Sequence, residues 1–242
     1  MIVVKLMGGM GNQLFQYAFG RSMEARGREV YFDRDPVDHD PKRNYCLNKF
    51  GLNIQFSRPI GHTFREKNTY FDPGVFSLDN CTFDGYWQSE KYFECVAPFL
   101  RKELTKAHIF SIEENSAFVH VRRGDNVYDS KSVAFHGCPD LNYYMSGIGY
   151  LENTVHPNRY YIYSDDIDWC KEHFNDPKIT IVQGSDYWDL QGMAACKYGI
   201  VSNSSFSWWG AWLGQAEIAI APKKWYVSYD EGDTVPKRWV RL

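Results

Sequence analysis

The sequence predicts an α/β protein built on parallel β-sheets, and three observations carry this prediction. The chain opens with a short apolar run, Ile2–Leu6, then a glycine-rich turn and a segment of helical spacing, and a second apolar run follows. A strand, a helix and a strand in that order form a crossover that leaves the two strands parallel. A second series of this kind begins near residue 117. The length of 242 residues allows one large domain or two small ones.

The first series occupies the beginning of the chain. Gly27 is a typical C-cap and ends its first helix. Residues 33 to about 90 are less regular, with turn-rich patches such as Asp33–Pro36. The elements expected here are strands at 2–6 and 29–32 and helices at 12–26 and 89–105.

The second series alternates apolar runs with helical spacing. Residues 124–140 are expected to form a long loop. Together the two series predict two α/β units with a cleft between them, joined near residues 105–115. The strands expected in the second unit are 117–121, 160–163, 180–182, 198–201 and 218–221, and the helices are 141–151, 164–170, 186–196 and 207–213.

Composition excludes several classes of protein. The net charge of −3, from 27 basic and 30 acidic residues, gives no footprint for nucleic acid. No apolar segment reaches 18 residues, and the first apolar run is too short for a signal peptide, so no transmembrane segment is expected. Six cysteines without a C-x-x-C pair predict free thiols in a reducing cytoplasm rather than a zinc site or a disulfide framework.

The segment His120–Asp125, with the sequence HVRRGD, follows a strand-like apolar run. Arg122 and Arg123 therefore stand where a strand ends, which is the edge at which open α/β sheets bind ligands. The planar fork of arginine suits phosphate oxygens, so the pair predicts a pyrophosphate site. The alternative interpretation is a surface ion pair that ends the strand.

Two further loops of the second series follow strands and precede helices. Asp165 and Asp166 supply acceptors that could read a base or a ribose, and Asn203, Ser204 and Ser205 supply donors at a helix N-terminus. In a parallel sheet all three loops lie on one edge. As alternatives, Ser164–Asp166 is an ordinary N-cap and Asn203–Ser205 a plain capping turn. The two aspartates are adjacent and begin a helix, so no metal site is predicted.

Two aromatic and glycine features are less specific. The run Trp208–Trp212 predicts core packing against the sheet, with sugar stacking by one tryptophan as the alternative. The turn Gly8–Gly11 lacks both the G-x-G-x-x-G spacing and the lysine of a P-loop, although it lets the backbone approach a ligand closely.

Five segments stand in order over nearly the whole chain: GGMGNQLFQYAFGR (8–21), GYWQSEKYF (85–93), HVRRGD (120–125), YIYSDD (161–166) and SNSSFSWWGAWL (202–213). Together they resemble the α-1,2-fucosyltransferases of glycosyltransferase family 11. His136-Gly137 followed by Leu141-x-Tyr143-Tyr144 also looks like the family pattern.

The resemblance implies a GT-B fold, in which two Rossmann-like units face a cleft. Residues 1–110 would form the acceptor-side domain and residues 111–242 the GDP-sugar-binding domain, with the last residues able to pack back on the first domain. The donor would be GDP-β-L-fucose and the acceptor a galactose-containing glycan. Transfer would invert the anomeric carbon and form an α-1,2 link. No metal or cofactor would be needed, because side chains neutralise the diphosphate.

The resemblance also assigns roles by position. Arg122 would contact the β-phosphate as a catalytic residue, His120 and one of Asp165 and Asp166 would lie near the guanine, and Ser204 and Ser205 would bind phosphate or fucose. The glycine loop would face the donor across the cleft. The other expected substrate-binding residues are Gly9, Gly11, Asn12, Gln13, Arg123, Asn203 and Phe206.

A general base for the attacking hydroxyl remains open at this point. Asp125 is the second expected catalytic residue because it lies in the motif, and its alternative role is to hold Arg122 or the loop by an ion pair. Asp129, His136 and Glu90 are the other candidates.

The stretch between Asp33 and Asp84 looks abbreviated for the family, and it belongs to the acceptor side. The absence of an anchor fits a bacterial or phage-like cytoplasmic enzyme, as in bacterial surface polysaccharide synthesis, in which peripheral contact with a lipid-linked acceptor could occur. The alternatives are a transferase of the same fold for another GDP-sugar and a non-catalytic nucleotide-sugar-binding module. A Rossmann dehydrogenase fits less well, because the glycine spacing is wrong.

Overall fold

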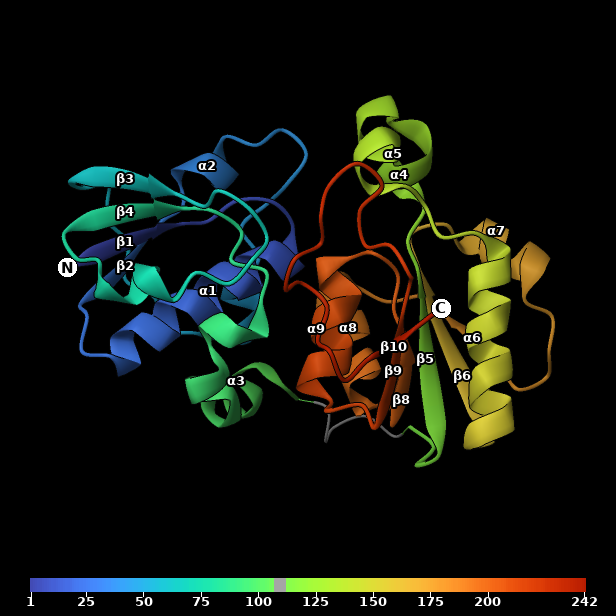
Figure 1. Cartoon of the computed structure of the whole chain (residues 1–242). Coiled ribbons are helices and arrows are strands. Elements are labelled where there is room, and N and C mark those ends of the chain that lie inside the picture. Colours follow the sequence, from blue (N-terminus) through green and yellow to red (C-terminus); the bar gives the residue numbers. More distant parts are fainter. Residues whose placement is uncertain (107–111) are drawn as a thin grey trace. The chain divides into compact units, whose positions relative to one another are not determined.

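The structure is a computed structural model that describes residues 1–106 and 112–242, apart from the side chains of residues 125, 126, 131 and 132. It divides into two compact units. Unit 1 comprises residues 1–104 and 231–236, and unit 2 comprises residues 105–230 and 237–242. Each unit has its own parallel sheet (Figure 1). The predicted fold class, α/β with two units that each carry a parallel sheet, is confirmed.

Unit 1 is built on a four-stranded sheet with the order β2-β1-β4-β3, in which every pair is parallel. The predictions of β1, β2 and the helix α1 (Met10–Ala25) are confirmed. The strands are β1 (Ile2–Lys5), β2 (Val30–Asp33), β3 (His62–Arg65) and β4 (Cys81–Asp84).

Residues 33–90 hold only short elements, as the less regular pattern predicts, but the strands β3 and β4 lie there and were not predicted. The residues of β3 are mostly exposed at the edge of the sheet, so this strand has no apolar run to reveal it. Four short helical elements occupy the same stretch or border it: α2 (Asp35–Asp38), η1 (Leu47–Phe50), η2 (Pro73–Ser77) and η3 (Glu90–Tyr92).

The helix predicted over 89–105 begins later than expected. Ser89 caps the short turn η3, η4 (Glu94–Val96) follows, and the α-helix α3 (Ala97–Leu104) starts only at Ala97. Pro98 explains the late start, since proline is tolerated in the first turn of a helix but clashes with the carbonyl four residues earlier in its interior.

The C-terminal segment 231–236 is anchored in unit 1 through Asp233. Its carboxylate accepts the backbone N–H of Phe71 at 2.9 Å and pairs with the Lys91 ammonium at 2.5 Å. Its own N–H donates to the carbonyl of Thr69 at 3.0 Å. The chain therefore leaves unit 2 at residue 230 and returns to it at residue 237.

Unit 2 is built on a six-stranded parallel sheet with the order β10-β9-β8-β5-β6-β7. All five strands predicted here are confirmed, and only the two-residue β10 was not predicted. The strands are β5 (Ser116–Val121), β6 (Arg159–Ser164), β7 (Ile179–Val182), β8 (Tyr198–Ile200), β9 (Ile218–Ala221) and β10 (Val240–Arg241).

Helices cover both faces of this sheet, with α6 on one face and α8 and α9 on the other (Figure 1). The long loop predicted over 124–140 is wrong, because two short helices form there. Val133 and Phe135 are partly exposed, so these helices lack the buried stripe that makes helical spacing visible. The helices are α4 (Gly124–Tyr128), α5 (Ser130–His136), α6 (Leu141–Thr154), α7 (Ile167–His173), α8 (Asp186–Ala195) and α9 (Ser205–Leu213).

Two further sequence predictions are confirmed. Trp208, Trp209 and Trp212 are buried and pack against one another in the core, so core packing and not sugar stacking accounts for them. All six cysteines are free thiols.

Candidate functional site

The three loops singled out in the sequence lie on one edge of the unit 2 sheet, as predicted. They follow β8, β5 and β6, which are neighbours in the sheet and run parallel. Val121, the last residue of β5, pairs in register with Ser164, the last residue of β6. The side chains that follow these two strands therefore start at the same level.

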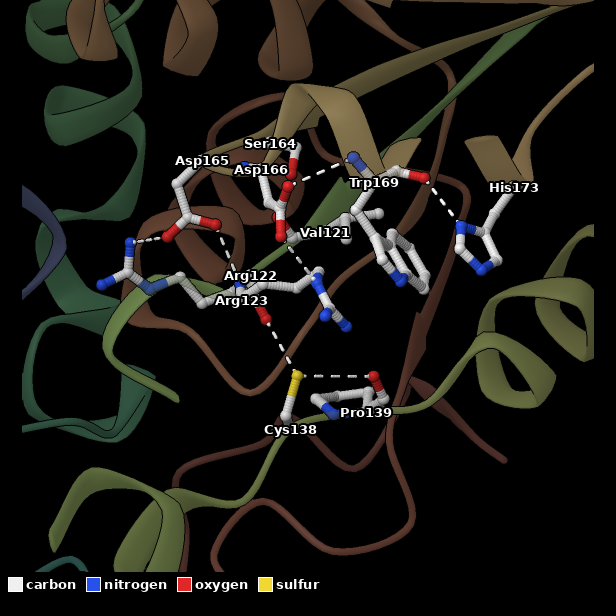
Figure 2. A network of polar contacts seen from close by, with 10 residues as sticks. All are labelled: Val121, Arg122, Arg123, Cys138, Pro139, Ser164, Asp165, Asp166, Trp169 and His173. Carbon is white, nitrogen blue, oxygen red and sulfur yellow. Dashed lines mark hydrogen bonds and ion pairs between the residues drawn. The ribbon is translucent and has the colours of Figure 1, made fainter. Parts of the chain in front are cut away.

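Arg122 and Asp165 form an ion pair across this edge. The Nη1 of Arg122 donates to Oδ2 of Asp165, and Oδ1 of the same carboxylate accepts the backbone N–H of Arg123 at 2.8 Å (Figure 2). Gly124 makes the approach possible, because a Cβ at this position would collide with Asp165 Oδ2. The carboxylate thus fixes the backbone and the guanidinium of the motif together.

Arg123 is held in a second, parallel pair. Its Nε donates to Oδ2 of Asp166 at 2.9 Å, and its guanidinium lies 4.3 Å from the centre of the Trp169 ring (Figure 2). Oδ1 of Asp166 accepts the N–H of Trp169 and caps α7. The ion pair with Arg123 lowers the pKa of Asp166. The N-cap and ion-pair interpretations are both confirmed, and the expected contact of Asp165 or Asp166 with guanine stays a prediction.

Hydrogen bonds to main-chain carbonyls close the edge beneath these pairs. Ser164 Oγ donates to the carbonyl of Val121 at 2.9 Å and accepts the N–H of Asp166 at 2.9 Å. The thiol of Cys138 donates to the carbonyl of Arg122 at 3.4 Å (Figure 2). Loop, strand end and helix start are therefore one connected network.

His120 lies beneath the arginines, only 5% exposed. Its Nδ1 is 3.0 Å from Ser202 Oγ, and its ring centre is 5.5 Å from that of Phe206. Burial, and next to it the Arg122 charge, lowers the pKa of His120 to about 3. The imidazole is therefore neutral near pH 7 and can offer one donor and one acceptor.

The third loop presents the N-terminus of α9. Ser204 caps the helix by accepting the N–H of Phe206, and Ser205 is its half-buried first residue. Asn203 Nδ2 donates to the carbonyl of His136 at 2.6 Å, whereas its buried Oδ1 has no partner among the described residues. A helix N-terminus with exposed N–H groups is a seat for an anion.

The glycine loop belongs to unit 1, at the start of α1. Gly9 is the N-cap and has open space around it, and Gly11 is buried in the helix. Gln13 is a structural brace, because its amide binds the carbonyls of Gly8 and Asn44 and the N–H of Cys46, each at 2.8 Å. Asn12 accepts a hydrogen bond from another loop, described below.

The candidate bases come from different elements of the two units. The side chain of Asp125 lies outside the described residues. Asp129 lies between α4 and α5, and His136 ends α5 with its ring against Phe135 and Tyr226. Glu90 begins η3 in unit 1.

Sequence reasoning missed one acidic side chain near this edge, Asp189 in the first turn of α8. Its Oδ1 is buried without a hydrogen-bond partner among the described residues and lies against Gly184 in the loop that follows β7. Burial, with a smaller contribution from Asp186, raises the pKa of Asp189 to about 6. The one feature of the sequence that could have indicated it is an acidic residue in the first turn of the helix that follows β7.

The described part of the chain has neither a metal-binding cluster nor a membrane-spanning helix. No cluster of three or more histidine, cysteine, aspartate and glutamate side chains there could hold a metal ion. No helix there is long and apolar enough to cross a membrane.

Two α/β units, each built on a parallel sheet, and one sheet edge with paired arginines and a helix N-terminus agree with the glycosyltransferase class that the sequence predicts. Residues 41–242 match the model of glycosyl transferase family 11, and the chain belongs to this family. It is 31% identical to the alpha-1,2-colitosyltransferase of Escherichia coli, over 100% of this chain and 98% of that protein.

Two other relatives match over nearly the whole chain. The O-antigen biosynthesis glycosyltransferase WbnK of Escherichia coli is 27% identical, over 98% of this chain and 99% of that protein. The galactoside 2-alpha-L-fucosyltransferase of Caenorhabditis elegans is 24% identical, over 100% of this chain and 79% of that protein.

Proposed function

We propose that the protein is an inverting galactoside α-1,2-fucosyltransferase that moves L-fucose from GDP-β-L-fucose to galactose O2 of a glycan. The observation that carries the proposal is the arginine pair at the end of β5, on the same sheet edge as the N-terminus of α9. Guanidinium groups and helix N-termini both suit a diphosphate. Family membership and the relative named galactoside 2-alpha-L-fucosyltransferase support the sugar and the linkage.

In the proposed reaction the acceptor hydroxyl oxygen bonds to C1 of fucose while the bond from C1 to the β-phosphate oxygen breaks. GDP leaves with the electron pair and gains negative charge, which a preorganised cation stabilises. Arg122 takes this role, aimed by Asp165. The hydroxyl proton passes to a base, for which Asp125 is the first candidate and Asp129, His136 and Glu90 are the others.

For the nucleotide base we add Asp189 to the expected contacts. Guanine offers neighbouring N–H donors that a carboxylate accepts. The carboxylates of Asp165 and Asp166 already accept from arginines, whereas Oδ1 of Asp189 is buried without a partner among the described residues. Neutral His120 would supply a further hydrogen bond to the nucleotide.

The remaining expected contacts keep their roles in this proposal. Arg123 and the serines of α9 would bind the diphosphate or fucose, and the glycine loop of unit 1 would contact substrate. Transfer would need no metal. Two Escherichia coli relatives, one named for O-antigen biosynthesis, support a place in bacterial surface polysaccharide synthesis, on the cytoplasmic side with a lipid-linked acceptor.

A second donor has a specific observation in its favour. The relative named alpha-1,2-colitosyltransferase is more similar to this chain than the fucosyltransferase relative, at 31% against 24% identity. GDP-colitose is therefore the alternative donor, with the same linkage.

The decisive experiment is to incubate the enzyme with GDP-fucose or GDP-colitose and a panel of galactosides, and to determine the linkage formed by NMR. An α-1,2-fucosyl galactoside, formed in the presence of EDTA, is the expected product. Transfer from GDP-colitose alone would establish the second donor. Transfer to another position, or only after metal is added, would contradict the proposal.

A further inference from the structure

The turn at residues 85–88 in unit 1 holds a bulky residue in an unusual backbone conformation. Trp87 has φ +56°, the left-handed region that β-strand and helix residues avoid and that bulky side chains rarely adopt. Its indole is fully buried and stacks on Phe19, with ring centres 4.5 Å apart. Such strain persists only where the surroundings impose it, and it is concentrated at functional sites.

Glu66 imposes this conformation. Its Oε2 accepts the backbone N–H of Tyr86 at 2.6 Å and that of Trp87 at 3.1 Å, so one carboxylate binds two successive N–H groups. Gly85 leaves the room for it, since a Cβ there would come within 2.5 Å of the Glu66 Cβ. The carboxylate therefore sets the direction in which the chain leaves the turn.

The turn delivers Gln88 to the glycine loop. Gln88 Nε2 donates to Oδ1 of Asn12 at 2.8 Å. A second link runs through Gln16, whose amide accepts the N–H of Met7 at 3.0 Å and donates to the carbonyl of Gly85 at 3.2 Å. The two loops are thus fixed to each other at two points.

This contact decides which end of the Asn12 amide is offered to a ligand. Oδ1 is occupied by Gln88, so the half-buried side chain presents its Nδ2 donors, which have no acceptor among the described residues. Gly8 leaves room for the group, because a Cβ there would lie 2.5 Å from Asn12 Nδ2. Donor N–H groups bind oxygen atoms, such as those of a hydroxyl or a phosphate.

We propose that Gln88 and Glu66 are positioning residues for the transfer reaction: Glu66 fixes the turn, and Gln88 orients Asn12 so that its N–H donors meet a substrate oxygen. The proposal rests on the proposed function, in which Asn12 contacts substrate. It adds two residues that act through Asn12 and do not touch the substrate themselves.

Gln88→Glu is the sharpest test, because the isosteric carboxylate cannot donate to Asn12 Oδ1 and attracts Nδ2 instead. We expect kcat/KM to fall about tenfold or more, to the level of Asn12→Ala, with little change in Tm. The double variant Asn12→Ala/Gln88→Glu should lose no more kcat/KM than Asn12→Ala alone, because the effects of residues that act as a unit are not additive. Gln55→Glu, the same change at an exposed position of unit 1, should have wild-type kinetics.

Glu66→Gln tests the first contact of the proposal, the one by which Glu66 fixes the turn at residues 85–88. It should lower kcat/KM less than Gln88→Glu and speed hydrogen exchange at the Tyr86 and Trp87 amides, because a neutral amide oxygen accepts these two N–H groups more weakly than a carboxylate does. Additive losses of kcat/KM in Asn12→Ala/Gln88→Glu, or unchanged kinetics in Gln88→Glu, would overturn the proposal.

A readout independent of transfer separates this proposal from the proposed function. The ¹⁵N side-chain amide signals of Asn12 should shift in Gln88→Glu whatever the substrate is, and unshifted signals would overturn the orienting role. A wild-type chain that transfers no sugar to any galactoside, with these signals shifted as expected, would refute the proposed function alone.

Discussion

Asp165 binds both arginines of the HVRRGD motif, because one carboxylate oxygen accepts from the Arg122 guanidinium and the other accepts the backbone N–H of Arg123. The Arg122 guanidinium is thereby held in one orientation, which the proposed reaction would use on the leaving phosphate. A cation that is already oriented needs no reorganisation when charge develops on a leaving group. Orientation and charge of Arg122 can therefore be tested separately.

Arg122→Lys tests the fork of the guanidinium. Lysine keeps the charge but lacks the paired donors, so we expect kcat to fall on the order of 10²–10³-fold, the usual effect of losing one preorganised donor. Steady-state transfer to a galactoside measures it. Arg65→Lys, at a side chain 80% exposed in unit 1, is the matched control. Near-normal turnover in Arg122→Lys would exclude the assignment.

Asp165→Asn tests whether this residue orients Arg122 or reads the base. Loss of the charged hydrogen bonds should cost about 1–3 kcal/mol of stability. If Asp165 orients the arginine, GDP and ADP should lose affinity equally, as measured by calorimetric titration. A variant that loses only its preference for GDP over ADP would show instead that Asp165 contacts guanine.

Gly124→Ala tests the close approach of Asp165 to the loop. The added Cβ collides with Asp165 Oδ2, so the carboxylate must move and the pair with Arg122 must open. We expect Gly124→Ala and Asp165→Asn to lower the transfer rate to a similar extent, because both open the pair with Arg122. Gly149→Ala, in α6 with no atom within 4 Å of the new Cβ, is the control and should keep full activity. Equal activity of Gly124→Ala and the control Gly149→Ala would contradict the prediction.

Asp189→Asn tests a carboxylate whose pKa burial raises to about 6, against 3.8 in the unfolded chain. Between these values the folded state binds the proton more tightly, so its stability falls as pH rises through this window. The variant should therefore have a higher Tm than wild type at pH 8, and the difference should vanish near pH 4. It should also lose its preference for GDP over ADP, because the carboxylate is proposed to accept hydrogen bonds from guanine. A buried carboxylate that lowers stability is expected to be retained for function.

The exposed Asp168→Asn is the control for that experiment, with its side chain 96% exposed. It should change neither the pH profile of Tm nor the nucleotide preference. A lower Tm of Asp189→Asn at pH 8 together with unchanged preference for GDP would show that Asp189 serves the fold instead.

Much of unit 2 could be predicted because its strands are continuous apolar runs. Every residue of β5 is buried, which is what a parallel strand covered on both faces requires. Strand β3 has an exposed edge sequence and gave no such signal. The helices α4 and α5 are short and partly exposed, so local turn signals outweighed their weak spacing.

The sequence predicted the sheet edge at which the site lies, but not which side chains pair with one another there. Parallel strands bring their carboxyl ends together, so loops that follow β5, β6 and β8 had to meet. The pairing of Arg122 with Asp165 and of Arg123 with Asp166 depends on the register between β5 and β6, which the sequence does not encode locally. Asp189 was missed because it lies inside a helix and not in a loop.

The return of residues 231–236 to unit 1 has a consequence for engineering. Unit 2 is not one continuous stretch of chain, since residues 105–230 and 237–242 belong together and the six residues between them belong to unit 1. A chimera that exchanges unit 2 between relatives must therefore splice at three points and keep Asp233 with its own Lys91 and Phe71. A single crossover near residue 105 would combine Asp233 from one parent with the Lys91 and Phe71 positions of the other.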